Sequence, residues 1–427
     1  MRMSLLLERE PFGDILTETL TPFWSRLLGQ QMQIDWWWNP PRRQLSGNDA
    51  GGRWLCNVYL NAIFPMGING LALEPIRREF SRSVVAWRRP LQQAYVALAL
   101  APRSARWFTH ALLQVAPVVE SIRRQVIVPG NNKIRILDRQ TETVYGVLKA
   151  GFSRDRFSAE IRAREQAESL GIPVPQLAAT DVAAGWFREQ YVVGTPLNRL
   201  SCRQTITSIT QRAAGSLQRL AEETRQKTIL CDYVDALQAS IGRHLNAVLT
   251  LENLTQTKSG TQFQASVHGR AVTAREKLAR QVLSGRSADA TIDTVQTHGD
   301  FQPANILVGE DEFWIIDWEY AARRQALYDT FVFHCQSRHS QIGSGCGLAA
   351  RLREFVNSGW ERLVNAENPP PVHTDIGDRS RRRRHAALFL LEDLDVRLAE
   401  NTYPRLTALN CGLRQLLNEI ESWNSFE

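Results

Sequence analysis

Apolar and polar residues alternate with the period of β-strands in the part of the chain that begins near residue 125. Three such segments follow one another and are separated by turn residues: 126–128, 133–137 and 143–149. Because side chains alternate between the two faces of a strand, this pattern predicts a small antiparallel sheet. Gly130 and Asn131 fall in the first turn, which is either an ordinary hairpin turn or a loop whose backbone N–H groups could meet phosphate oxygens.

The pattern then changes to the longer period of amphipathic helices. Residues 154–170 predict a helix that Gly171 and Pro173 end. Further apolar stripes recur at spacings of three and four: Ile206 to Leu220, Val234 to Val248, Leu391 to Leu398 and Leu406 to Ile420. Such stripes predict helices with one face in a core. The polar stretch 251–269 predicts a loop, and 273–283 predicts one more helix.

Residues 1–120 are rich in Trp and Arg. Residues 81–101 and 106–119 have apolar residues at helical spacing, so they predict helices, with Pro90 splitting the first. Basic and aromatic residues are interleaved along both segments. They could lie on an anionic membrane surface or form a packed helical subdomain with solvated arginines.

The stretch 297–317 reads THGDFQPANILVGEDEFWIID and holds the strongest candidate chemistry. Two short apolar runs flank a polar turn, so the stretch predicts a β-hairpin. Asn305 enters the first strand and Asp317 leaves the second, which brings them close together. Asp300 lies on the loop just before them.

An amide oxygen and two carboxylates that converge in this way suit Mg²⁺, which binds through one or two carboxylates and phosphate oxygens. Asn305 and Asp317 are the expected metal ligands. Asp300 is then available to orient a hydroxyl nucleophile and to accept its proton. Phosphoryl transfer needs little beyond in-line positioning and charge neutralisation.

These motifs resemble the aminoglycoside phosphotransferase and choline kinase branch of the protein-kinase-like fold. The branch pattern H-G-D-x-x-x-x-N-I-L followed by I-D-W-E appears here as HGDFQPANIL and IIDWEYA, and Asp329 matches a further family aspartate. The resemblance implies that His298 and Asp329 hold the shape of the catalytic loop. Gln302 departs from the pattern, because many members carry His at this position and protein kinases carry Lys.

The resemblance implies an α+β fold of two lobes: a small β-rich lobe over 121–195 and a large helical lobe over 196–427. Residues 1–120 would form a mainly helical extension before them. ATP and Mg²⁺ are the implied cofactors.

Within the small lobe, Lys149 ends a strand and matches the family lysine that contacts the ATP phosphates. Glu160 lies on the small-residue face of the following helix and is the expected partner of Lys149, whereas Glu165 lies off that face. Gly130 and Asn131 would cover the phosphates. Backbone groups near Gln190 and Val192 would read the adenine edge.

The composition of the chain says less about its function than the motifs do. The net charge of +7 and pI near 9.3 fit either an anionic partner or a mildly basic protein. The chain has no motif of a nucleic-acid-binding protein, which argues against nucleic acid as a partner. Six scattered cysteines without a C-x-x-C pair indicate a reducing compartment, and we expect a cytoplasmic protein that could work at the inner membrane face.

The resemblance implies transfer to a hydroxyl of a small molecule, a sugar or a glycolipid, and three functions are open. Arg379 and Arg381 to Arg384 form a basic cluster, either solvated or holding an anionic substrate. With the net charge, this cluster favours a sugar or a glycolipid, such as a cell-envelope saccharide. The alternatives are an aminoglycoside kinase, which would need an acidic cleft for its polycationic acceptor, and a kinase-like binding module without activity.

Overall fold

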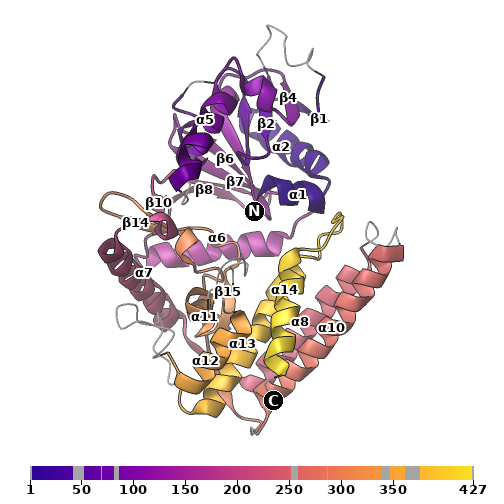
Figure 1. Ribbon diagram of the computed structural model, residues 1–427, viewed down its shortest axis with the longest axis vertical. Coiled ribbons are helices and arrows are strands. Elements are labelled where there is room, and N and C mark those ends of the chain that lie inside the picture. Colours follow the sequence, from indigo (N-terminus) through magenta and orange to yellow (C-terminus); the bar gives the residue numbers. More distant parts are fainter. Residues whose placement is uncertain are drawn as a thin grey trace. The chain divides into compact units, whose positions relative to one another are not determined.

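The computed structural model describes residues 2–41, 52–68, 70–80, 86–251, 258–285, 287–335, 337, 347–360 and 376–425. The chain divides into two compact units (Figure 1). The first holds residues 1–157 and 175–192, and the second holds residues 158–174 and 193–427.

The first unit is built around one antiparallel sheet with helices on both of its faces. Its helices are α1 (Met3–Arg9), α2 (Phe12–Leu28), α4 (Glu74–Phe80) and α5 (Arg89–Leu100). Its strands are β1 (Gln33–Trp38), β2 (Arg53–Asn57), β3 (Ala62–Pro65), β4 (Ala111–Ala116), β5 (Gln125–Pro129), β6 (Lys133–Asp138), β7 (Thr143–Leu148), β8 (Leu177–Asp181) and β9 (Trp186–Gln190). Short 3₁₀ turns are η1 (Ala86–Arg88), η2 (Ala105–Phe108) and η3 (Ile122–Arg124).

The sheet has nine strands in the order β1-β4-β2-β3-β5-β6-β7-β9-β8. Strands β5, β6 and β7 are the three that the alternating pattern predicts. β3 joins β5 through the pair Ile63 and Ile127, so residues 1–120 continue the same sheet. The early segment is therefore structurally part of the unit that holds Lys149.

Alternation along the strands explains the layers. Leu112 and Leu113 are both buried, yet they belong to different cores because neighbouring side chains point to opposite faces. The core around Leu113 includes α1 and α2, with Trp24 donating its ring N–H to the side-chain oxygen of Gln125 at 3.0 Å. The core around Leu112 includes α4 and α5.

Two helices are predicted in the second half of the early segment, and the structure contains one of them. The helix predicted over 81–101 is found as η1 and α5, with Pro90 in the first turn of α5, where a missing N–H costs nothing; its residues 81–85 lie outside the described part of the chain. The helix predicted over 106–119 is wrong, because this stretch forms η2 and then β4. Pairing with β1 and β2 on both sides overrides its helical spacing.

The second unit is mainly helical. Its helices are α6 (Arg154–Ser169, whose first turn belongs to the first unit), α7 (Arg203–Thr224), α8 (Leu230–Leu249), α10 (Lys258–Leu283), α11 (Tyr328–His334), α12 (Leu348–Ser358), α13 (Arg379–Ala399) and α14 (Cys411–Asn424). The remaining short elements are η4 (Leu197–Arg199), η5 (Pro303–Asn305), β10 (Thr195–Pro196), β11 (Gln226–Ile229), β12 (Thr291–Thr297), β13 (Ile306–Val308), β14 (Phe313–Ile315) and β15 (Ala322–Gln325).

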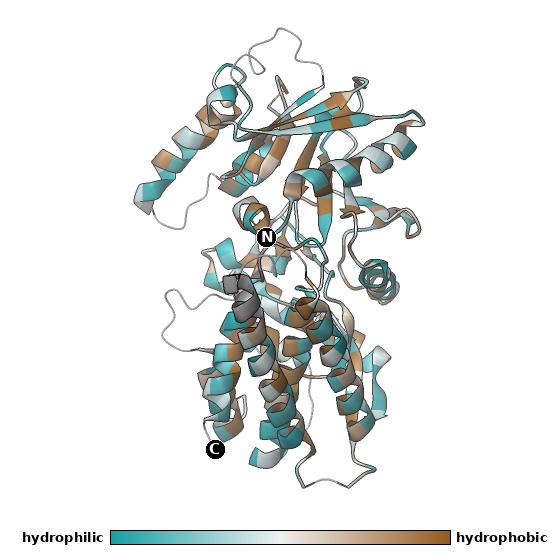
Figure 2. Ribbon diagram, turned by 90° about the vertical axis from the view of Figure 1, so that its right-hand side faces the viewer, coloured by the Kyte–Doolittle hydropathy of each residue, from teal (hydrophilic) through white to brown (hydrophobic). Residues whose placement is uncertain are grey.

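Helices α8, α10, α13 and α14 pack side by side, as Figure 1 shows. Brown and teal residues alternate along these ribbons in Figure 2, as expected of helices with one apolar face. The loop predicted over 251–269 is wrong for residues 258–269, which begin α10. Residues 258–266 read KSGTQFQAS and contain only two apolar residues, Phe263 and Ala265, so the sequence shows no apolar stripe that would reveal the first turns of this helix.

Glu392 of α13 makes stability depend on pH. Burial raises the pKa of this carboxyl to about 7, although hydrogen bonds from Tyr233 and Gln325 oppose the rise. Between the ordinary pKa of 4.5 and about 7, the folded state keeps a proton that the unfolded state has lost, so stability falls as pH rises. As the pH rises from 4.5 to 8, we expect the free energy of unfolding of Glu392→Gln to increase by about 3 kcal/mol relative to that of wild type.

Urea unfolding at several pH values measures this difference. Glu312→Gln, at an exposed position in the turn between β13 and β14, serves as the control and should show no such trend. A difference between Glu392→Gln and wild type that does not change with pH would contradict the expectation.

Candidate active site

The hairpin of β13 and β14 positions Asn305 and Asp317. Ile306 pairs with Ile315, and the backbone N–H of Ile316 donates to the carbonyl of Asn305 at 2.9 Å. Asn305 and Asp317 therefore lie at the open end of the hairpin, as the sequence predicts. Asp317 has a φ of 70°, a left-handed conformation that is uncommon outside glycine and is often found at functional sites.

Asp300 lies beside this open end and is half-buried. Its Oδ2 accepts hydrogen bonds from Nδ2 of Asn305 at 2.8 Å and from Nε2 of Gln302 at 2.9 Å. The same Nδ2 of Asn305 also donates to the carbonyl of Asp300 at 2.9 Å. These contacts fix the carboxylate and direct the amide nitrogen of Asn305 toward it, which leaves the amide oxygen as the atom suited to a metal.

Gln302 has a contact in the structure that the sequence did not predict. The sequence showed only that a neutral side chain replaces the His or Lys of related chains. In the structure the side-chain amide of Gln302 orients Asp300 instead.

His298 is fully buried and connects the loop to the hairpin. Its Nε2 lies 2.9 Å from the carbonyl of Ile316, and its Nδ1 accepts the backbone N–H of Asp300 at 3.2 Å. One imidazole therefore bridges the residue before Asp317 and the residue that carries the candidate base. The ring also packs on Trp318, with centroids 4.7 Å apart.

Asp329, on the first turn of α11, accepts from the backbone N–H groups of His298 and Gly299 at 2.7 and 2.8 Å. Burial raises the pKa of Asp329, while His298 and the two N–H groups oppose that rise. Gly299 has a φ of 84°, and a Cβ there would lie 2.1 Å from the carbonyl oxygen of Tyr320. A glycine is required for the loop to pass this closely.

Comparison with known proteins shows which family the chain belongs to. The model of the phosphotransferase enzyme family, APH, matches residues 147–363, which is 217 of the 427 residues. The chain belongs to this phosphotransferase family. The predicted resemblance, the α+β protein-kinase-like fold and the expectation of an enzyme that transfers phosphoryl groups to a hydroxyl acceptor are thereby confirmed.

Solved structures similar to this phosphotransferase include three kinases of small molecules. A choline kinase from Streptococcus pneumoniae has 13% identity, covers 72% of this chain and 92% of its own, and has a TM-score of 0.39. An aminoglycoside phosphotransferase from Streptomyces rimosus has 18% identity, covers 62% and 91%, and has a TM-score of 0.36. A glucosamine kinase has 13% identity, covers 72% and 81%, and has a TM-score of 0.39. No curated protein matches the sequence at a significant level.

Lys149 of the phosphotransferase follows β7 and is 1% exposed. Its Nζ lies 2.5 Å from Oε1 of Glu10, and both side chains are buried. Glu10 stands between α1 and α2, 139 residues away in sequence, and no local pattern marks it as a partner. The pairing of Lys149 with Glu160, which belongs to the second unit, stays a prediction.

The other nucleotide-site candidates lie at strand ends of the first unit. Gly130 and Asn131 form the turn between β5 and β6, and Asn131 is buried, with its side-chain oxygen 3.0 Å from Nη1 of Arg9. Gln190 ends β9 and donates its backbone N–H to the carbonyl of Gln176 at 2.9 Å. Val192 is the last residue of this unit. Their contacts with ATP stay predictions.

The basic cluster lies at the start of α13. Arg383 and Arg384 line a surface cavity of about 430 Å³ together with Lys277, Arg280, Gln281, Ser284 and Ser380. The other end of α13 reaches the active-site region, where Tyr320 donates to Glu400 at 2.5 Å. At about 1.5 Å per residue, the 16 residues from Arg384 to Glu400 span about 24 Å, too far for the cluster to hold a small acceptor beside Asp300.

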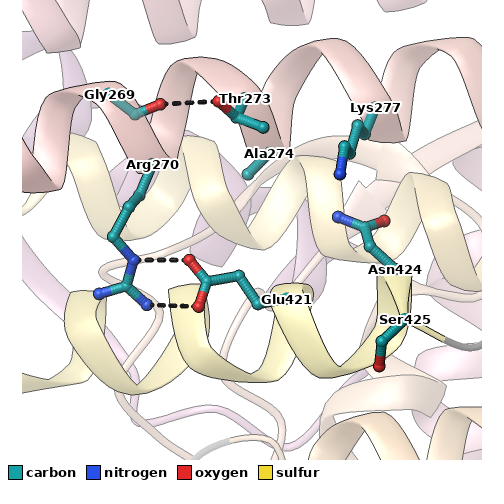
Figure 3. Close-up of a pocket in the computed structure, with 8 residues that line it drawn as sticks. All are labelled: Gly269, Arg270, Thr273, Ala274, Lys277, Glu421, Asn424 and Ser425. Atoms are coloured by element: carbon teal, nitrogen blue, oxygen red, sulfur yellow. Dashed lines mark hydrogen bonds and ion pairs between the residues drawn. The ribbon is translucent and has the colours of Figure 1, made fainter.

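A second surface cavity, of about 500 Å³, lies between α10 and α14 (Figure 3). Arg270 of α10 and Glu421 of α14 both line it and form an ion pair with a shortest distance of 2.6 Å. Neither of these two cavities is lined by a residue of the catalytic loop, so neither is the active site.

Proposed function

We propose that the phosphotransferase transfers the γ-phosphoryl group of ATP to a hydroxyl group of a sugar or a glycolipid. The observation that supports this most directly is the convergence of Asp300, Asn305 and Asp317 at one end of the hairpin. In the proposed reaction, Asp300 accepts the proton of the acceptor hydroxyl. The hydroxyl oxygen then bonds to the γ-phosphorus, and the bond to the oxygen of ADP breaks.

Asn305 and Asp317 fit the needs of Mg²⁺, since the ion accepts few protein ligands when phosphate oxygens and water complete its shell. Magnesium bound there would neutralise the charge of the phosphates. Lys149 would contact the α- and β-phosphates, with Glu10 and Glu160 to orient it. The loop at Gly130 and Asn131 would cover the phosphates, and Gln190 and Val192 would border the adenine.

The contact between Lys149 and Glu10 allows a test of this arrangement. We expect Glu10→Gln to lower kcat/KM for ATP by about tenfold or more and to destabilise the fold by roughly 3 kcal/mol, because it removes a buried carboxylate that lies 2.5 Å from the Lys149 ammonium. In the double variant Glu10→Gln with Lys149→Met, the stability should largely return while the activity stays low. Restored activity in the double variant would show that Lys149 has no role with ATP.

A neutral or anionic acceptor agrees better with the acidic residues of α13 than a polycationic drug does. Glu392 and Asp393 are each 1% exposed and bond to interior partners, among them Tyr233 and Tyr328. These two residues therefore add no acidic surface for an aminoglycoside, and Asp395, whose side chain is 23% exposed, lies 3.6 Å from Nε2 of His244. The charge of the whole chain, +7, points in the same direction.

The experiment is transfer of label from γ-labelled ATP with Mg²⁺ to molecules of a cell extract, with Asp300→Asn as the control. The products are separated into aqueous, glycolipid and protein fractions. Label that requires Asp300 and enters the glycolipid fraction supports a glycolipid acceptor, and aqueous label indicates a soluble sugar, alcohol or aminoglycoside. ATP binding without any Asp300-dependent label would favour the inactive binding module.

A further inference from the structure

Helix α5 is apolar on two opposite faces, although only one of them meets the rest of the unit. Val96, Ala99 and Leu100 are buried in the core that covers the sheet. Leu91 and Leu98 are 66% and 51% exposed. Because each residue advances about 100° around a helix, these two leucines share one face, opposite the buried one.

Exposed aromatic residues lie on the two short elements that contact α5. Trp87 of η1 precedes Leu91 by one helical turn and is 66% exposed. Trp107 of η2, which packs next to α5, is 59% exposed. We call Trp87, Leu91, Leu98 and Trp107 the α5 face. Large apolar side chains gathered in this way on a surface indicate a binding site.

The stretch of chain that forms the α5 face carries positive charge alone. Residues 80–119 contain five arginines and no Asp or Glu. The guanidinium of Arg88 lies over the ring of Trp87 at 5.0 Å, and that of Arg106 lies over Trp107 at 5.7 Å. Acidic residues border this stretch on both sides: Glu74 and Glu79 lie on α4 with Arg77 and Arg78, and Glu120 forms ion pairs with Arg123 and Arg124.

We propose that the α5 face binds the surface of an anionic lipid bilayer. Leucines would enter the boundary between headgroups and acyl chains, tryptophans would lie at the headgroup level, and arginines would contact lipid phosphates. None of the described helices is long and apolar enough to cross a membrane, whereas a helix lying in the interface needs only one such face. The charge complementarity selects an anionic bilayer over a neutral one.

Flotation of the full-length protein with vesicles tests the proposal. Vesicles of phosphatidylglycerol and phosphatidylethanolamine are compared with vesicles of phosphatidylcholine, at 50 mM and 500 mM salt. We expect binding to the anionic vesicles at low salt and much weaker binding in the other conditions, because salt screens the arginine contacts. Failure to bind anionic vesicles at low salt would overturn the proposal.

Two pairs of substitutions separate the apolar and the charged contributions. The pair Leu91→Gln and Leu98→Gln should weaken vesicle binding by about tenfold or more. The pair Arg88→Gln and Arg103→Gln should weaken it by about 25-fold, at about fivefold for each charge. All four positions are exposed, so the fold should tolerate the changes, and a thermal unfolding curve checks this.

Matched controls use exposed positions of the second unit. Ile229→Gln with Leu249→Gln removes two apolar side chains, and Lys227→Gln with Arg243→Gln removes two charges. Equal losses in the controls and in the α5 variants would contradict a specific face. Asp300→Asn should bind vesicles as wild type does, so this proposal and the proposed function can fail separately.

Discussion

Asp300→Asn is expected to lower kcat for phosphoryl transfer by about a thousandfold, within the range that general-base catalysis contributes. The substitution keeps the size of the side chain and one oxygen that can accept from Asn305 and Gln302. It removes the negative charge that would take the proton of the acceptor hydroxyl. The loss should therefore fall on kcat, while the Kd for ATP with Mg²⁺ changes less than about threefold.

Steady-state kinetics and nucleotide binding by calorimetry measure the two quantities. Asp311→Asn is the matched control, because Asp311 is exposed in the turn of the same hairpin and lies away from its open end. The control should retain wild-type activity. A variant at Asp300 with more than a tenth of the wild-type kcat would exclude Asp300 as the base.

Asp317→Asn is expected to produce a loss of similar size for a different reason. A carboxylate at the open end of the hairpin would hold Mg²⁺, and an ion that neutralises phosphate charge is worth several kcal/mol in the transition state. We expect kcat to fall by about a thousandfold. The Kd for ATP with Mg²⁺ should rise at least tenfold, whereas the Kd for ATP in the presence of a chelator should stay constant.

The comparison of the two nucleotide affinities makes this prediction specific to the metal. If Asp317 had only a structural role, its substitution would raise the Kd for ATP both with Mg²⁺ and with a chelator. A thermal unfolding curve would then show that the variant is destabilised. Raising the concentration of Mn²⁺ should restore part of the activity of Asp317→Asn, since the ion then compensates for its weaker site. Asp311→Asn again serves as the control and should respond to Mg²⁺ as wild type does.

The extension shows where prediction from sequence is weakest. Residues 111–116 have apolar residues that suit a helix or a strand, and only pairing with β1 and β2 selects the strand. The same difficulty applies to residues 258–269, which look like a loop because few of them are apolar. Residues 111–116 form a strand because partner strands far away in the chain pair with them, whereas residues 258–269 have too few apolar residues to show a helical stripe.

The charged residues of the second unit illustrate a similar limit. The sequence groups Arg379 with Arg381 to Arg384 and shows Glu392 and Asp393 close behind them. It does not reveal that the carboxylates point into the core, or that the arginines lie at the end of α13 remote from Tyr320. Helix length and direction separate these groups in space although they are neighbours in sequence.

The sequence by itself determined which candidate site residues meet at the hairpin. Asp300, Asn305 and Asp317 lie within 18 residues, and a short turn between two strands leaves little freedom in how they meet. The resemblance named Asp329 as a support of this loop, but only the tertiary structure shows which atoms it contacts and that Glu10 is a partner of Lys149. Asp329 reaches back 31 residues to His298, and Glu10 lies 139 residues from Lys149. Such pairs form because buried charges and N–H groups need partners, and the folded core decides which partner is within reach.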